Sequence, residues 1–458
     1  MEIQTGALII VLAYMVGMMI IGYVVGKINI KGSADYLVAG RRMGLFMVAF
    51  SLSANNIGGG STTGLAQKAF GAWGISAIWY VLAASLAMIP LAYFAPKIRK
   101  TMAVTIPEVV GRRFGKLSSN FTAVLSVLSL FCLTSSQIGA SGAVINALIP
   151  SIPLNVCLLL AGFVTIFYTT FGGMIADQVS DLIQFGIILV GLAIATPIVL
   201  KYAGGWQAIS AALPGEKLNM TQIGWASIIG YFFNYFCTFL CAILMAAMSI
   251  FPTLLGLAAF ALKDQLPGLA ENGSNAMMVV TGAYAPGIIT GLISAAIICA
   301  TMSSADSNLL CMSTMIINDI YPGFGGKKKL EDKQVIFYTR LCNVIAALIA
   351  MGISMFGVSL VAMNTFAFGI RCAGPFAAYG LGLAVPKATK NSGMISIFTG
   401  TIAFVVWQLL SNGGTLWFMM PVVFGSLVSV ITFYVVNLIE WKRGVPAAPS
   451  AYAVEEAK

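Results

Sequence analysis

Apolar segments about as long as a membrane is thick recur along the whole chain, separated by short polar loops. Roughly 20 apolar residues suffice to cross a bilayer as a helix. The pattern predicts helices at 6–26, 44–69, 74–95, 119–149, 154–173, 178–200, 223–262, 286–318, 335–357, 359–386, 392–411 and 416–439. The interval 223–262 is too long for one crossing, so we expect two. The pattern therefore predicts an all-α polytopic membrane protein with about thirteen transmembrane helices.

The charges of the loops predict the orientation in the membrane. With the N-terminus outside and two crossings in 223–262, most of the 25 Lys and Arg residues fall on one side, and only Lys201, Lys217 and Lys263 fall on the other. Basic loops face the cytoplasm. We therefore expect a multi-pass protein of the cell (plasma or inner) membrane, with its N-terminus outside and its C-terminus cytoplasmic. We also expect the first apolar segment to be retained, because it lacks the flanking pattern of a signal peptide.

The composition narrows the function classes further. Hydrophobic residues make up 59% of the chain and charged residues 9%, and the mean hydropathy is +0.93. The net charge of +10 could suit nucleic acid, but the basic residues occupy loops between spans, so we expect the lipid bilayer and no nucleic acid as a partner. The chain has no His, and its 8 Cys residues show no metal-ligand spacing. We expect no cofactor, no zinc site and no enzyme activity.

The interval 223–262 raises a problem of its own. Residues 218–262 contain no Asp, Glu, Lys or Arg, although a cytoplasmic turn is expected near Cys241 and Ala242. We expect that a polar, basic segment is missing from this chain at that point. The alternative is a tight, uncharged re-entrant turn, which is disfavoured because irregular backbone is not tolerated where it faces lipid.

The second predicted span is interrupted near its middle. Three consecutive glycines, Gly58, Gly59 and Gly60, follow Asn55 and Asn56. Such a segment can unwind and offer free carbonyl groups to a cation and free N–H groups to an anionic ligand. The alternative is a glycine surface for close helix packing. Packing alone does not account for two amide side chains at the same depth.

The span at 286–318 carries hydroxyls and an acid within one apolar stretch. Ser303, Ser304 and Ser307 lie within about one helical turn, and Asp306 lies among them. Ionisable groups at this depth are costly and usually functional. Oxygen ligands of this kind suit a small alkali cation. The alternative is that each serine bonds back to its own helix.

A second acid, Asp181, begins the span at 178–200 and shares a helix face with Asp177, which we expect to lie nearer water. Asp181 together with Asp306 could bind a second cation, or it could simply favour the first turn of a helix through the helix dipole. Arg371 is the only clearly intramembrane cation. It either holds a substrate carboxylate or neutralises Asp306 or Asp181 in a structural pair. Contact with substrate would favour an anionic or zwitterionic solute, such as an amino acid or small carboxylate.

Several motifs, in order, resemble the sodium/solute symporter family of the sodium-glucose, proline and pantothenate type. They are the loop at 35–42, the broken second span, the stretch from Phe171-Gly172-Gly173 to Asp181, and the stretch from Ser303-Ser304 to Asp319-Ile320-Tyr321. Ile57-Gly58-Gly59-Gly60 and Met302-Ser303-Ser304-Ala305-Asp306-Ser307 are most similar to the high-affinity choline transporter branch.

The resemblance implies a LeuT-like core of two inverted five-helix repeats. The chain would divide into an extra N-terminal helix at 6–26, repeats at 44–200 and 223–386, peripheral helices at 392–439 and a cytoplasmic tail at 440–458. By motif position, a sodium ion would take the carbonyls of Ala54, Ile57 and Ala300 and the hydroxyls of Ser303 and Ser304. A second cation site would fall on Asp181, Ser304, Asp306 and Ser307, and substrate would lie at Asn56, Gly58 and Gly59.

The function implied is sodium-coupled symport of a small organic solute into the cell by alternating access. Choline is disfavoured, because Asn56 stands where the choline branch has a tryptophan and the third and fourth spans offer Ala83 and Cys132 in place of aromatic side chains. Two alternatives stay open, a proton-coupled carrier and a non-transporting substrate sensor. The solute, the stoichiometry and the oligomeric state are not determined by the sequence.

Overall fold

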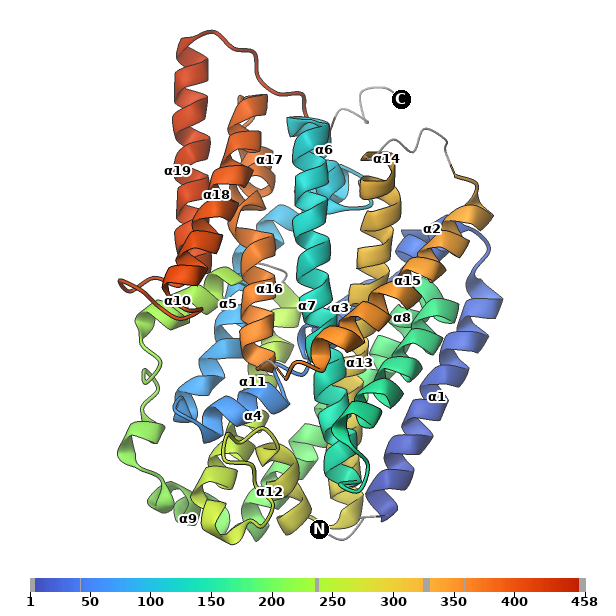
Figure 1. Ribbon diagram of the computed structural model, residues 1–458, viewed down its shortest axis with the longest axis vertical. Helices are drawn as coiled ribbons and strands as arrows, with labels where there is room; N and C mark the ends of the chain where they lie inside the picture. Colours follow the sequence, from blue (N-terminus) through green and yellow to red (C-terminus); the bar gives the residue numbers. More distant parts are fainter. Residues whose placement is uncertain (1–4, 42, 235–238, 324–329, 358, 453–458) are drawn as a thin grey trace.

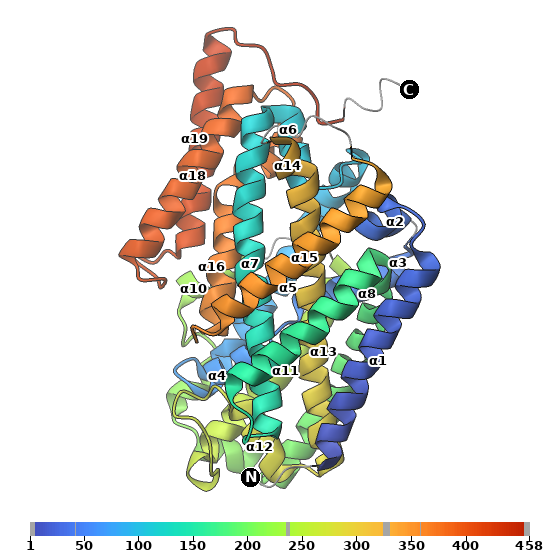
Figure 2. The same cartoon turned by 45° about the vertical axis from the view of Figure 1, so that its right-hand side comes forward.

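The computed structural model describes residues 5–41, 43–234, 239–323, 330–357 and 359–452. In these segments the chain is helical, and Leu416 and Met419 form an isolated β-bridge. Most long helices run roughly along the long axis of the molecule (Figures 1 and 2). The basic cluster Lys327, Lys328 and Lys329 and the end of the expected tail, 453–458, lie outside the described residues.

Seven helices in the described segments are long and apolar enough to cross a membrane. They are α1 (Thr5–Asn29), α7 (Lys116–Leu148), α8 (Leu154–Tyr202), α13 (Gly287–Met315), α15 (Asp332–Ser354), α18 (Lys390–Leu410) and α19 (Pro421–Lys442). Further helices in the apolar intervals include α5 (Trp79–Lys100) and α16 (Leu360–Ala373). The all-helical class is confirmed, and the number of about thirteen crossings is not.

Helix α8 contains two of the predicted spans, and the chain changes direction between them at Gly173. Gly173, inside this helix, has φ 58° and ψ −171°, which lies outside the helical region. A non-glycine residue rarely adopts a positive φ, so glycine permits the change of direction here. A Cβ at this position would also overlap the ring of Tyr36. The predicted spans at 154–173 and 178–200 are therefore the two parts of α8.

The interval 223–262 contains two helices, α10 (Trp225–Asn234) and α11 (Phe239–Ala261). The predicted turn near Cys241 and Ala242 is wrong, because both residues lie within α11. Residues 235–238, between α10 and α11, lie outside the described residues.

The predicted interruption of the second span is confirmed. Helix α3 (Leu45–Asn56) ends before the glycines, and α4 (Thr63–Phe70) begins after them. Ile57, directly after α3, has φ −99° and ψ 83°, so the backbone leaves the helical conformation there. Helix α13 passes this break in the centre of the molecule: 83% of its most apolar stretch is buried, against 22% for α1 at the edge.

Helix α1 packs against α8 through Gly22 and Gly26. A Cβ added to Gly26 would overlap the carbonyl oxygen of Phe171 in α8, whereas one added to Gly17 of the same helix would meet nothing within 4 Å. Small residues four positions apart allow two helix backbones to approach closely.

We expect Gly26→Ala to lower the free energy of unfolding by about 1–3 kcal/mol, because a backbone atom cannot move aside as a side chain can. The temperature of thermal unfolding in detergent measures this loss. Gly17→Ala is the matched control and should leave that temperature nearly unchanged. Equal effects of the two substitutions would contradict close packing of α1 on α8.

Candidate functional site

The hydroxyls of α13 meet the end of α3 at the break. Ser303 Oγ lies 3.1 Å from both the Ala54 carbonyl oxygen of α3 and the Ala300 carbonyl oxygen of its own helix. Ser304 Oγ lies 2.7 Å from the Asn55 carbonyl oxygen and 3.1 Å from that of Ala300. Each serine therefore bonds back to its own helix, as the alternative predicted, and also reaches across to α3.

Four of the five residues predicted for the sodium site are thus joined by hydrogen bonds, namely Ala54, Ala300, Ser303 and Ser304. The fifth, Ile57, is buried at the same break, where the backbone is no longer helical. Every candidate ligand atom in this set is a carbonyl or hydroxyl oxygen. Unwound backbone carbonyls and hydroxyls suit Na⁺, so this donor set fits a small alkali cation.

Next to this group lies a cluster of three acids, Asp177 and Asp181 of α8 and Asp306 of α13. One carboxylate oxygen from each lies within 4.8 Å of the others, and all three residues are buried. Asp177, expected to lie nearer water than Asp181, is buried as well, with exposed fractions of 2% and 0% for the two residues. Asp181 lies in the second turn after the break at Gly173, not in the first. The helix dipole at a first turn is therefore not what holds Asp181 there.

Polar side chains link these acids to the end of α3. Ser307 Oγ donates to Asp177 at 2.7 Å, and the Asn55 amide donates to Ser307 Oγ at 2.5 Å and to Asp181 at 3.4 Å. The backbone N–H of Ser307 donates to Asp306 at 2.8 Å. Asp181, Asp306 and Ser307 of the predicted second site are thus together, whereas Ser304 reaches them through Asn55.

The charge of this cluster is not balanced within the described chain. One oxygen of each acid has no hydrogen-bond partner there, and the ion pair found in the described segments, between Arg112 and Glu108, lies elsewhere. Several ionised carboxylates cannot share a buried site unless cations or protons offset their repulsion and lost hydration. The cluster therefore requires bound positive charge.

The glycines of the break are closely packed. The Gly59 N–H donates to Gln137 Oε1 of α7 at 2.6 Å, and a Cβ on Gly58 would overlap the same side chain. A Cβ on Gly60 would overlap the Asn364 amide of α16. Close packing, the alternative reading of these glycines, therefore applies. The Asn56 amide donates to the Leu52 carbonyl of its own helix at 2.7 Å.

Three polar residues at this place were not predicted from the sequence. Gln137 and Asn364 face the glycines, and Ser136 donates a hydrogen bond to Asn364. The sequence contains a signal for Gln137 and Asn364, because amide side chains inside the apolar intervals 119–149 and 359–386 are unusual at membrane depth. Ala83 and Cys132, which the third and fourth spans offer in place of aromatic side chains, are not among the nearest neighbours of these glycines. From α5 it is the buried Tyr80 that approaches Gly60.

Arg371 lies seven residues beyond Asn364 on α16, about 10 Å further along the helix axis. Its guanidinium lies 5.4 Å from the ring centre of Phe368. No ion pair joins it to Asp306 or Asp181, all three residues being in the described part of the chain. The structure thus does not support the structural-pair alternative. The side chains nearest to Gly58 and Gly59 are those of Gln137, Ala140 and Thr301, not that of Arg371.

Comparison with known proteins gives relatives across the whole chain. A sodium/proline symporter of Staphylococcus aureus (strain bovine RF122 / ET3-1) is 25% identical, with 95% of this chain and 93% of the relative covered, and that of strain JH9 has the same identity and coverage. The alignment spans 485 positions and is longer than this chain of 458 residues, so the relative has residues that this chain lacks.

Two solved structures share the fold. One is a Na⁺-coupled sialic acid symporter in a substrate-bound outward-open state, for which a novel Na⁺ site was described; it has a TM-score of 0.80 and 22% identity, and 97% of this chain and 98% of that chain are covered. The other is Mhp1, a nucleobase-cation-symport-1 family transporter, in a closed conformation, with a TM-score of 0.61, 15% identity and coverages of 93% and 98%. Both likenesses support the LeuT-like fold.

The family comparison covers most of the chain. The sequence profile of one family matches residues 36–223 and 226–400, the segments that contain the broken helix, the acid cluster and Arg371. The relatives are transporters and not enzymes. On this match, the chain belongs to the sodium:solute symporter family, a family of sodium-coupled membrane transporters.

Proposed function

We propose that this protein is a sodium-coupled symporter that imports a small organic solute by alternating access. The observation that carries the proposal is the oxygen-lined contact between the broken helix and α13, where Ser303 reaches the carbonyls of Ala54 and Ala300. A cation there would tie the two helices together. Solute bound at the same break would then be coupled to the cation through the shared helix ends.

The first sodium ion would be held by Ala54, Ile57, Ala300, Ser303 and Ser304. A second cation would be held by Asp181, Asp306 and Ser307, with Ser304 between the two sites. The unpaired carboxylate oxygens described above support the second site. The same acids favour a second candidate function, a proton-coupled carrier, because protons could supply the required positive charge.

For the solute we favour an amino acid or small carboxylate, bound at Asn56, Gly58, Gly59 and Arg371. The N–H of Gly59 already donates to an acceptor oxygen, that of Gln137, so an anionic group could take the place of that oxygen. Arg371 has no carboxylate partner among the described residues. The names of the sodium/proline symporters favour an amino acid. Choline remains disfavoured, and the likeness to the choline branch stays a prediction.

The proposal also covers the division of the chain into repeats and its orientation in the membrane. The repeats would span 44–200 and 223–386, with 6–26, 392–439 and the tail at 440–458 outside the core. Helices α18 and α19 lie side by side at one edge of the molecule in both views, which supports their peripheral assignment (Figures 1 and 2). The end with the basic loops would face the cytoplasm. The longer alignment with the relatives supports a segment missing from this chain.

Uptake into proteoliposomes tests this function. With an inward sodium gradient, we expect accumulation of radiolabelled proline or of another member of a panel of amino acids and small carboxylates. Replacing external sodium by potassium at equal ionic strength should abolish it. Accumulation driven by a pH gradient without sodium would establish the proton-coupled alternative. Solute-dependent thermal stabilisation without any accumulation would instead indicate a sensor.

A further inference from the structure

A cavity of about 570 Å³ opens at the end of the molecule that carries α6 (Ile106–Phe114). Its walls come from α2 (Ser33–Val38), α3, α8, α13 and the segment between α5 and α6. Val48, Met174, Gln178, Cys311 and Thr314 are among the lining residues. The lining is mostly apolar, and its polar members are Arg99, Thr105, Gln178 and Thr314.

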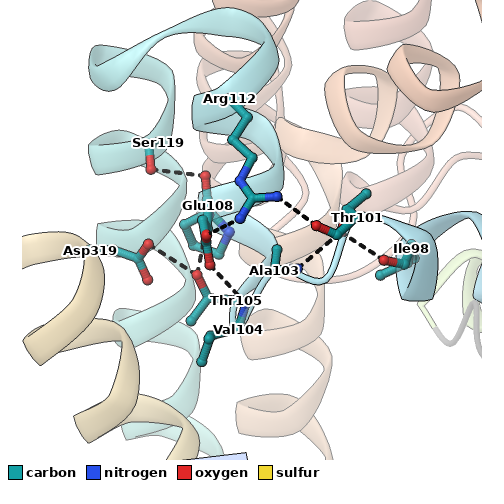
Figure 3. A network of polar contacts seen from close by, with 10 residues as sticks. Ile98, Thr101, Ala103, Val104, Thr105, Glu108, Arg112, Ser119 and Asp319 are labelled. Carbon is teal, nitrogen blue, oxygen red and sulfur yellow. Dashed lines mark hydrogen bonds and ion pairs between the residues drawn. The ribbon is translucent and has the colours of Figure 1, made fainter. Parts of the chain in front are cut away.

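A polar network holds one rim of this cavity in place (Figure 3). Thr105 Oγ1 donates to Asp319 at 3.0 Å and so joins the segment before α6 to the end of the α13 span. Glu108 accepts from the Val104 N–H at 2.7 Å and pairs with Arg112 at 2.5 Å. The ion pair of Glu108 and Arg112 therefore belongs to a larger network. The rim is fixed to α13, the helix that also carries Ser303 and Asp306.

The inner wall of the cavity is connected to the acid cluster by a short chain of hydrogen bonds. Gln178 Nε2 donates to Ser51 Oγ at 2.8 Å, and Ser51 Oγ donates to Asp181. Ser51 is buried, and of Gln178, Ser51 and Asp181 only Gln178 lines the cavity. Gln178 Oε1 is buried and has no hydrogen-bond partner in the described structure.

We propose that Gln178 is a relay ligand for the cation that moves between the acid cluster and this cavity. The proposal rests on the proposed function, since it assumes a transported cation at Asp181 and Asp306. A cation that leaves the three carboxylates for this mostly apolar cavity loses those ligands, which is costly unless other polar groups replace them. The free carbonyl oxygen of Gln178 supplies a ligand at that step. Its amide, held by Ser51, keeps this oxygen beside the path.

The test compares two variants of α8 in the exchange of ²²Na⁺ across proteoliposomes. Gln178→Leu removes the oxygen at similar volume and should slow exchange about tenfold, the loss expected when a contact to a charged group is removed. Met174→Leu is the matched control, since Met174 lines the same cavity one turn away and should exchange at the wild-type rate. Gln178→Asn, which keeps an amide, should recover part of the rate.

A second measurement separates a relay from a structural role. Thermal stabilisation by sodium reports equilibrium binding, so it should be the same in Gln178→Leu and the wild type. Loss of that stabilisation would assign Gln178 to the site itself or to the fold and would overturn the relay. Exchange at the wild-type rate in Gln178→Leu would overturn it as well. A wild type without sodium exchange but with proton-driven uptake would instead contradict the proposed sodium coupling on which the relay rests.

Discussion

Replacing Ser303 with alanine should remove most of the thermal stabilisation that sodium gives this protein. Ser303 is fully buried and its hydroxyl lies between two carbonyl oxygens from different helices, so its loss removes a ligand and the link between them. Losses of 10–100-fold in affinity are typical even for residues behind the ligands. At a sodium concentration of about 100 times Kd, a 100-fold loss lowers the stabilisation from about 2.7 to about 0.4 kcal/mol.

The measurement is the difference in unfolding temperature between sodium and potassium chloride at equal ionic strength. Both salts are measured on the same variant, so the loss of stability that the missing hydrogen bond causes in either salt drops out of this difference. Ser313→Ala is a suitable control, because Ser313 is equally buried on α13 but bonds only to the Leu309 and Leu310 carbonyls of its own helix. We expect Ser313→Ala to keep the full sodium effect. The sodium site at the break is ruled out if Ser303→Ala keeps it too.

Replacing Arg371 with glutamine should abolish solute uptake and leave sodium stabilisation intact. Arg371 has no acidic partner in the described segments, so its removal leaves no carboxylate there without its counter-ion. A solute carboxylate would lose its cation instead, and breaking such a pair costs about 2–5 kcal/mol. That range corresponds to a solute affinity at least about 30-fold weaker, which saturation of sodium-driven uptake would measure.

Arg371→Lys is the control that separates charge from shape. Lysine keeps the positive charge but lacks the planar fork that binds a carboxylate through two hydrogen bonds. We expect partial uptake with a raised KM for solute. If Arg371→Gln instead reduces sodium stabilisation as strongly as Ser303→Ala, then Arg371 acts through the cation sites, and the preference for an anionic or zwitterionic solute loses its support.

The predictions that succeeded rest on short-range patterns. The break after Asn56 follows from three adjacent glycines beside amides, and the pairing of Ser303 with Ala300 follows from helical spacing. The contact between Ala54 and Ser303 was predicted from the family resemblance alone. The two residues are 249 positions apart, so helical spacing gives no information about it. The turn expected at Cys241 failed for a similar reason, since a uniformly apolar interval holds no local signal for where one helix ends.

The sequence by itself determined that the protein is helical and spans a membrane, that the second span is broken, and that this span and the span at 286–318 carry polar groups. These properties depend on the length of apolar segments and on the spacing of polar residues, which can be read within a few helical turns. Only the tertiary structure decided that Asp306 of α13 joins Asp177 and Asp181 of α8, and that Gln137 meets the N–H of Gly59. It also decided that Arg371 has no acidic neighbour among the described residues. These facts depend on which helices become neighbours and how they are rotated, and the free energy of packing the whole chain selects that arrangement.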